Sequence, residues 1–142
     1  MKVNLSGIPS LSKIEPEIVS EFIPKLKEAT LYATKLTPMQ LISLLSNLNK
    51  TEHDLQSLDL GGSNFSSISS QMIFNSIKNI QMVNLYYTKL SASQMIDILQ
   101  NIIESDGIIK LKHLDIGGNS SNIPEDILEQ AQHELTCLKI HS

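Results

Sequence analysis

The segment at residues 58–63 reads LDLGGS, and it returns at residues 114–119 as LDIGGN. A second segment repeats at nearly the same distance, because YATKLTPMQ at residues 32–40 becomes YYTKLSASQ at residues 86–94. Self-similarity at a fixed period of this size is typical of proteins built from stacked repeats, in which each repeat buries its apolar side against its neighbours. The chain is therefore expected to be a repeat protein.

Six apolar residues mark the ends of the expected strands: Leu5, Leu31, Leu60, Leu85, Ile116 and Ile140. The steps between neighbouring markers are uneven, at 26, 29, 25, 31 and 24 residues. Steps over two markers are nearly constant, at 55, 54, 56 and 55 residues. Two kinds of repeat therefore alternate, and the recurring unit is a pair of about 55 residues.

Each repeat begins with alternating apolar residues and continues with apolar residues spaced three and four apart. The alternation predicts a short strand, because every second side chain of a strand points to the same face. The later spacing predicts a helix with one apolar face. The expected helical stripes are Ile18, Phe22 and Leu26; Leu41, Leu44, Leu45 and Leu48; Ile73, Ile77 and Ile80; Met95, Ile98, Leu99 and Ile102; and Ile127, Leu128, Ala131 and Leu135. Strands that alternate with helices predict a parallel sheet with right-handed crossovers.

Short local signals predict how the helices start and where the strands turn. Residues 37–40 and 91–94 each place a hydroxyl residue three positions before Gln, which predicts a capping box. Residues 122–125, NIPE, indicate a similar start for a later helix. The glycine pairs at residues 61–62 and 117–118 lack the neighbouring Lys or helix start of a phosphate loop. They are expected to form tight turns, where glycine tolerates positive φ.

With these elements the chain resembles a leucine-rich repeat protein, and its repeat lengths are similar to those of the ribonuclease-inhibitor-like subclass. The resemblance runs from Val3 to Ile140 and rests on the pattern L-x-x-L-x-L-x-x-S-x-F at residues 55–65 and its counterpart at residues 111–119. It implies one right-handed α/β solenoid over residues 1–142, with about six parallel strands on a concave side and about five helices on a convex side. Ser121 departs from the pattern, because it stands where a core leucine is expected.

Composition limits the class of protein. The 142 residues are 41% hydrophobic, which is enough for one continuous core. No apolar run approaches the roughly 20 residues that span a bilayer, and no signal-peptide pattern precedes the first strand, so no membrane partner is expected. The net charge is −4 and the lysines are scattered, so no nucleic-acid partner is expected. The single cysteine, Cys137, cannot form an internal disulfide, which favours a cytoplasmic protein.

The resemblance implies that strand residues outside the core line the concave side. Tyr32, Gly61, Tyr86 and Gly117 directly follow the markers of four neighbouring strands. Because parallel strands lie about 4.8 Å apart, the two rings are expected about 10 Å apart, with a gap at each glycine. Exposed tyrosines supply rigid contact area that interfaces favour.

Polar residues lie beside these tyrosines in the same strands. Asp59 and Asp115 precede their markers and flank Asn84, and His113 lies on the same side two positions before Asp115. Our hypothesis is a shallow binding site, with tyrosine walls and an acidic floor, for a Lys or Arg side chain of a partner protein. In the alternative, Tyr32 and Tyr86 cover neighbouring strands and the aspartates keep the sheet face soluble.

The four histidines and Cys137 are the candidates for metal binding or catalysis. None of them has the short spacing of a zinc site. His113 and Cys137 fall in the same row of adjacent strands, and His141 lies on the same side. An open sheet face, however, supplies neither the enclosed pocket nor the oxyanion site that acyl transfer requires. We therefore expect no metal, no cofactor and no catalytic activity.

The interpretation that follows is a non-catalytic protein–protein interaction module that binds through its concave strand face. Two alternatives stay open. The chain is a secreted bacterial effector that binds a protein in the host cytosol by the same face, or it is a fragment of a larger leucine-rich repeat receptor or inhibitor. The open edges of the first and last strands are also templates for self-association.

Overall fold

The computed structural model describes residues 1–50, 52–120 and 122–140, so the departure at Ser121 and the position of His141 lie outside the described residues. Within them the chain forms an α/β fold with a parallel sheet in the order β1-β2-β3-β4-β5-β6. The strands are β1 Lys2–Asn4, β2 Glu28–Thr30, β3 Ser57–Asp59, β4 Met82–Asn84, β5 His113–Asp115 and β6 Cys137–Lys139. The helices are α1 Pro16–Phe22, α2 Pro38–Lys50, α3 Ser70–Ile77, α4 Ala92–Glu104 and α5 Glu125–Glu134, with short 3-10 helices η1 Pro9–Lys13 and η2 Ile23–Lys25.

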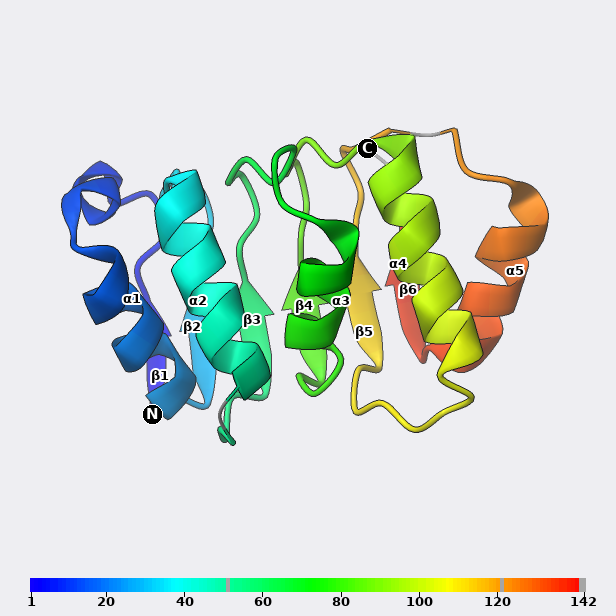
Figure 1. The fold of residues 1–142 in the computed structure, drawn as a ribbon, viewed down its shortest axis with the longest axis horizontal. Coiled ribbons are helices and arrows are strands. Elements are labelled where there is room, and N and C mark those ends of the chain that lie inside the picture. Colours follow the sequence, from blue (N-terminus) through cyan, green and yellow to red (C-terminus); the bar gives the residue numbers. More distant parts are fainter. Residues whose placement is uncertain (51, 121, 141–142) are drawn as a thin grey trace.

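The helices lie side by side across one face of the sheet (Figure 1). We call the opposite face of the sheet the open face. Every pair of neighbouring strands is parallel and in the same register, so that Leu58 of β3 opposes Val83 of β4, which opposes Leu114 of β5. These central residues are buried, whereas the first and third residues of the same strands are at least partly exposed. The predicted α/β fold with a parallel sheet is confirmed.

The core fills the space between the sheet and the helices, and it consists mainly of Leu and Ile. The predicted stripes of α2, α3 and α4 are buried as expected, and α5 is buried at Ala131 and more loosely packed at Ile127 and Leu128. The stripe predicted for α1 is wrong at Ile18 and Phe22, which are exposed, and confirmed at Leu26, which is buried.

In α1 the buried residues lie one position after the predicted residues Ile18 and Phe22. Val19 and Ile23 are buried, and so is Leu26 directly after η2. Val19 and Ile23 lie four positions apart and each follows a predicted residue by one position, so the buried face of the helix is rotated by one residue from the predicted face. Packing of α1 against α2 selects this face.

Both predicted capping boxes are confirmed. The Thr37 and Ser91 hydroxyls accept from the amides of Gln40 and Gln94, whose side-chain oxygens accept from the cap amides. Each Gln side chain also donates to two carbonyls of the preceding repeat at 2.8 Å, those of Leu11 and Ile14 for Gln40 and those of Phe65 and Ile68 for Gln94. The two halves of the chain thus repeat the same tertiary hydrogen bonds.

The turns after the strands follow the prediction, and the start of α5 does not. Gly62 and Gly118 have φ of +84° and +70°, which confirms their interpretation as turn residues. The cap residue of α5 is Pro124, which makes no side-chain capping bond. Asn122 lies two residues before the cap, too early for its side chain to serve the first amides of the helix.

Candidate interaction face

A row of acidic and amide side chains crosses the open face at the third position of successive strands. Asp59 of β3 opposes Asn84 of β4, and Asn84 opposes Asp115 of β5. The order Asp–Asn–Asp is the one predicted. Because each step between parallel strands is about 4.8 Å, the two aspartates lie about 10 Å apart.

Each member of this row also supports the turn that follows its strand. The side-chain oxygen of Asp59 accepts a hydrogen bond from the amide of Gly61 at 2.9 Å. Asn84 and Asp115 accept in the same way from the amides two residues later, at 2.8 and 2.9 Å. These are Asx turns, which Asp and Asn form equally well. In these three turns the side-chain oxygen is what is used, and Asn84 shows that a negative charge is not needed.

Burial makes the charge at Asp59 unfavourable. It raises the pKa of this carboxyl above its ordinary value, and the nearby charge of Asp115 raises it further. Hydrogen bonds from the Gly61 amide and the Asn84 side chain oppose that rise without cancelling it. The open face thus carries a carboxylate in a position where Asn would be less costly.

A shallow pocket of about 270 Å³ lies over β3 to β6 on the open face. It is lined by four of the six residues predicted for the site, namely Asp59, Asn84, His113 and Asp115. It is also lined by Met82, whose side chain is 48% exposed and which sequence analysis did not select. The signal for Met82 was present, since an apolar residue stands there at an outward-facing strand position.

The two predicted tyrosines lie beyond this pocket, in the turns that follow β2 and β4. The ring of Tyr32 covers Gly61, because a Cβ atom on that glycine would lie 2.6 Å from the Tyr32 Cδ2 atom. Tyr32 therefore fills the gap that was expected at Gly61. Tyr86 is half-buried, and its ring meets the ring of Tyr87 edge to face at a centroid distance of 4.4 Å.

Tyr87 is the exposed aromatic residue of the second turn. Its ring covers Gly118 in the way that Tyr32 covers Gly61. A hydrogen bond with Tyr87 raises the pKa of Tyr86, and burial and the charges of Tyr32 and Asp115 raise it further. Tyr32 adjoins the acidic row, because the Cβ position of Gly61 lies 2.6 Å from the Tyr32 Cδ2 atom and 3.1 Å from an Asp59 carboxylate oxygen.

The remaining candidates for metal binding or catalysis on the open face are His113 and Cys137. His113 and Cys137 are register partners in β5 and β6 and line the same pocket. Within the part of the chain that the structure describes, no group of three His, Cys, Asp or Glu residues is arranged to hold a metal ion. In that same part, no helix has the length and apolar character needed to cross a membrane.

No protein-family model matches the chain, and no curated protein was found to match it.

Proposed function

We propose that this chain is a right-handed leucine-rich repeat solenoid whose open face is a non-catalytic binding surface for a partner protein. The fold assignment is supported by the sequential order of parallel strands, by their common register and by the hydrogen bonds that recur between the two halves. The partner in this proposal presents a Lys or Arg side chain to Asp59 and Asp115.

The observation that carries the proposal is the charge of the acidic row. Asn84 forms the same Asx turn as its two neighbours without any charge. Asp59 forms it at the cost of a partly buried carboxylate whose pKa is raised by burial. A charge that the fold does not need, and that burial disfavours, is the expected mark of a group kept for binding.

The surroundings of the row suit a protein ligand. Met82, two residues before Asn84 in β4, exposes an apolar side chain in the pocket that the two aspartates also line, and Tyr32 and Tyr87 expose rings in the adjacent turns. Met and Tyr are enriched at protein interfaces. A cationic side chain that reaches the acidic row would therefore be surrounded by apolar contact area.

The test compares affinity capture by the wild type and by the Asp59→Asn/Asp115→Asn double variant, with mass spectrometry of the captured proteins. Asn keeps the Asx turn, so the variant removes two charges and leaves the fold in place. The matched control is Asp54→Asn/Asp106→Asn, which removes two exposed charges from the loops before β3 and β5. We expect a protein that the wild type and the control capture and the open-face variant does not. Equal capture by all three would refute the proposal.

A further inference from the structure

The ring of Tyr32 and the carboxylate of Asp59 come together at Gly61, in the turns beside the acidic row. A Cβ atom on Gly61 would lie 2.6 and 2.9 Å from the Cδ2 and Cε2 atoms of Tyr32, and 3.1 Å from the Oδ1 atom of Asp59. The first two distances are too short for a real Cβ atom. The ring can therefore take this place beside the carboxylate only because residue 61 has no side chain.

The turn after β2 does not need the Tyr32 ring. The equivalent residues in the turns after β1, β3 and β5 are Ser6, Gly61 and Gly117, and these chain segments also form turns. The side chain of Tyr32 is 38% exposed, so it is not part of the core. A position that small residues occupy elsewhere thus carries a large exposed ring next to an acidic group.

Asp59 is the member of the acidic row with uncharged neighbours on both sides. Its register partners in β2 and β4 are Thr30 and Asn84. Asp115, in contrast, has Lys139 as its register partner in β6. The charge of Asp115 reaches Asp59, where it adds to the negative potential. An external cation is therefore attracted more strongly to Asp59 than to Asp115.

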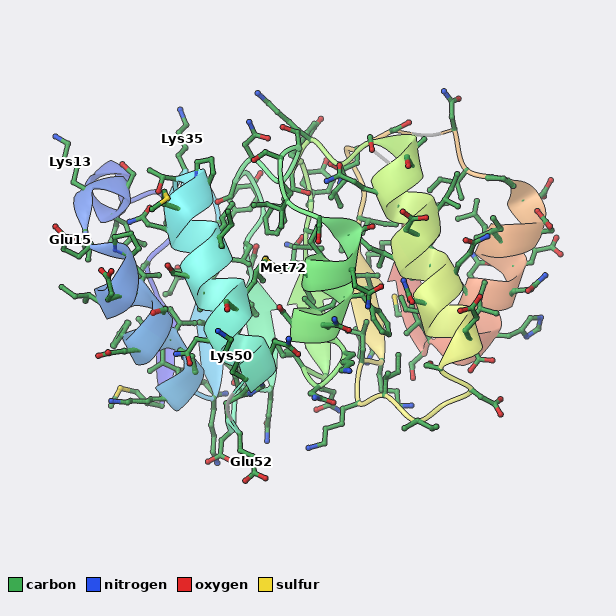
Figure 2. The ribbon with its side chains drawn as sticks, in the orientation of Figure 1. Lys13, Glu15, Lys35, Lys50, Glu52 and Met72 are labelled. Carbon is green, nitrogen blue, oxygen red and sulfur yellow. The ribbon has the colours of Figure 1, made fainter. Side chains whose placement is uncertain are left out.

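The Asp59 carboxylate also has room for further hydrogen bonds. A carboxylate has about four lone-pair sites. The Gly61 amide and the Asn84 side chain use two of them. The cation of the turn that holds Tyr32 is Lys35, and Figure 2 shows its side chain extending outward beyond the start of α2. The sites that remain on Asp59 suit a donor from a partner.

A carboxylate beside a tyrosine ring suits a guanidinium better than an ammonium ion. The guanidinium of Arg is planar, so it stacks on an aromatic face while its N–H groups pair with a carboxylate. The ammonium of Lys is a compact and more strongly hydrated charge, which gains less from the ring.

We propose that Tyr32 and Asp59 bind an arginine side chain of the partner protein, with the guanidinium stacked on the Tyr32 ring and paired with the Asp59 carboxylate. This rests on the proposed function, because it names the residue type of the partner that the open face recognises. Lysine binds at the same place more weakly.

The test measures the binding of octa-arginine and of octa-lysine by isothermal titration calorimetry at about 150 mM salt, which screens long-range attraction. We expect the wild type to bind octa-arginine at least about threefold more tightly than octa-lysine, as cation–π contact at an exposed ring provides. Tyr32→Ser, which introduces the residue type of Ser6, is expected to abolish this preference. The matched control is Tyr87→Ala, which removes an exposed ring from the turn after β4 and introduces the residue type of Ala33. It is expected to keep the preference.

Two further variants separate the position of the ring from its presence. Gly61→Ala displaces the Tyr32 ring, and because Gly61 is not among the glycines with positive φ, Ala suits the backbone there. We expect it to lower the affinity for octa-arginine to that of Tyr32→Ser. Its affinity for octa-lysine shows whether the nearby carboxylate is disturbed. Tyr32→Phe keeps the ring and is expected to bind like the wild type.

Equal binding of both peptides by the wild type, lost in Asp59→Asn/Asp115→Asn, would overturn the arginine site and leave the proposed function standing. Binding of neither peptide at about 1 mM would also overturn the arginine site, and affinity capture would still decide the proposed function. So would a preference that Tyr32→Ser keeps or that Tyr87→Ala loses equally. Thermal unfolding shows whether each variant is folded, and if Tyr32→Ser is not, Gly61→Ala decides.

Discussion

The turns after β3 and β5 have almost the same sequence, yet their hydrogen bonding differs. After β5, the side-chain amide of Asn119 donates to the carbonyls of Leu85, Ile116 and Gly117. Its side-chain oxygen accepts from the amides of Thr88 and Leu90. Asn119 therefore joins two repeats. After β3, the equivalent residue is Ser63. Its hydroxyl is buried and has no hydrogen-bond partner within the described residues.

This difference shows that the interactions that set the backbone conformation of the turn are distinct from the side-chain hydrogen bonds that stabilise it. Both turns contain a glycine at positive φ. In the turns beside them, after β2 and β4, the buried Thr34 and Thr88 hydroxyls donate to carbonyls three residues earlier at 2.8 and 2.7 Å. The backbone conformation therefore does not depend on Asn119. What Asn119 adds is hydrogen bonds to backbone groups of two repeats, whereas the Ser63 hydroxyl makes none within the described residues.

The largest expected effect comes from removing the Asn119 side chain. Asn119→Ala removes the acceptor of the Thr88 and Leu90 amides and a donor to the Ile116 carbonyl, and each unsatisfied buried group costs about 1–3 kcal/mol. We expect the free energy of unfolding to fall by about 3 kcal/mol and the melting temperature by roughly 10 °C. Urea and thermal unfolding measure both quantities.

The control for this substitution is Asn122→Ala, at an exposed residue of the same loop region. Its effect is expected to stay within about 0.5 kcal/mol. If Asn119→Ala changed the free energy of unfolding as little as the control does, water would be replacing the hydrogen bonds of the side chain. The difference in hydrogen bonding between the two turns would then make no difference to stability.

Ser63→Asn is the reverse experiment and has a smaller expected effect. An Asn at this position has the amide and the carbonyl needed to repeat the Asn119 bonds in the preceding repeat, so the free energy of unfolding is expected to rise by about 1 kcal/mol. Urea unfolding of the single variant measures the gain. Destabilisation instead would mean that the space around Ser63, which is 1% exposed, is too small for the larger side chain.

These contrasts also show how far the sequence could predict the structure. The strand register and the stripes of α2, α3 and α4 follow from the period of the apolar residues, because burial on one face fixes that period. The α1 phase was wrong because Ile18 and Val19 are both apolar and adjacent, and only packing against α2 decides between them. A pattern of apolar residues cannot distinguish a buried stripe from an exposed one beside it.

The sequence predicted which strand residues are neighbours in the candidate site, but it did not predict every side-chain contact there. The adjacency of Asp59, Asn84 and Asp115 follows from the register, because equivalent residues of parallel strands are neighbours. The coverage of Gly61 by Tyr32 could not be predicted, since it depends on the side-chain direction of a residue in a turn. The Asx turns explain why Asp and Asn occur there and leave only the charge to be explained by function.

Asp59→Asn gives the smallest effect on stability and tests whether the charge is costly to the fold. Burial raises the pKa of Asp59 in the folded protein, so the folded state binds the proton more tightly than the unfolded state, whose pKa is about 4. The protonated carboxyl therefore stabilises the fold at low pH, and this stability is lost as the pH rises through the folded pKa. Asp59→Asn should be more stable than the wild type at about pH 7 and show no such gain at about pH 3, whereas Asn84→Asp should lose stability at the higher pH. Urea unfolding at both pH values measures the free energy of unfolding of each variant. If Asp59→Asn were no more stable than the wild type at neutral pH, the Asp59 carboxylate would not destabilise the fold.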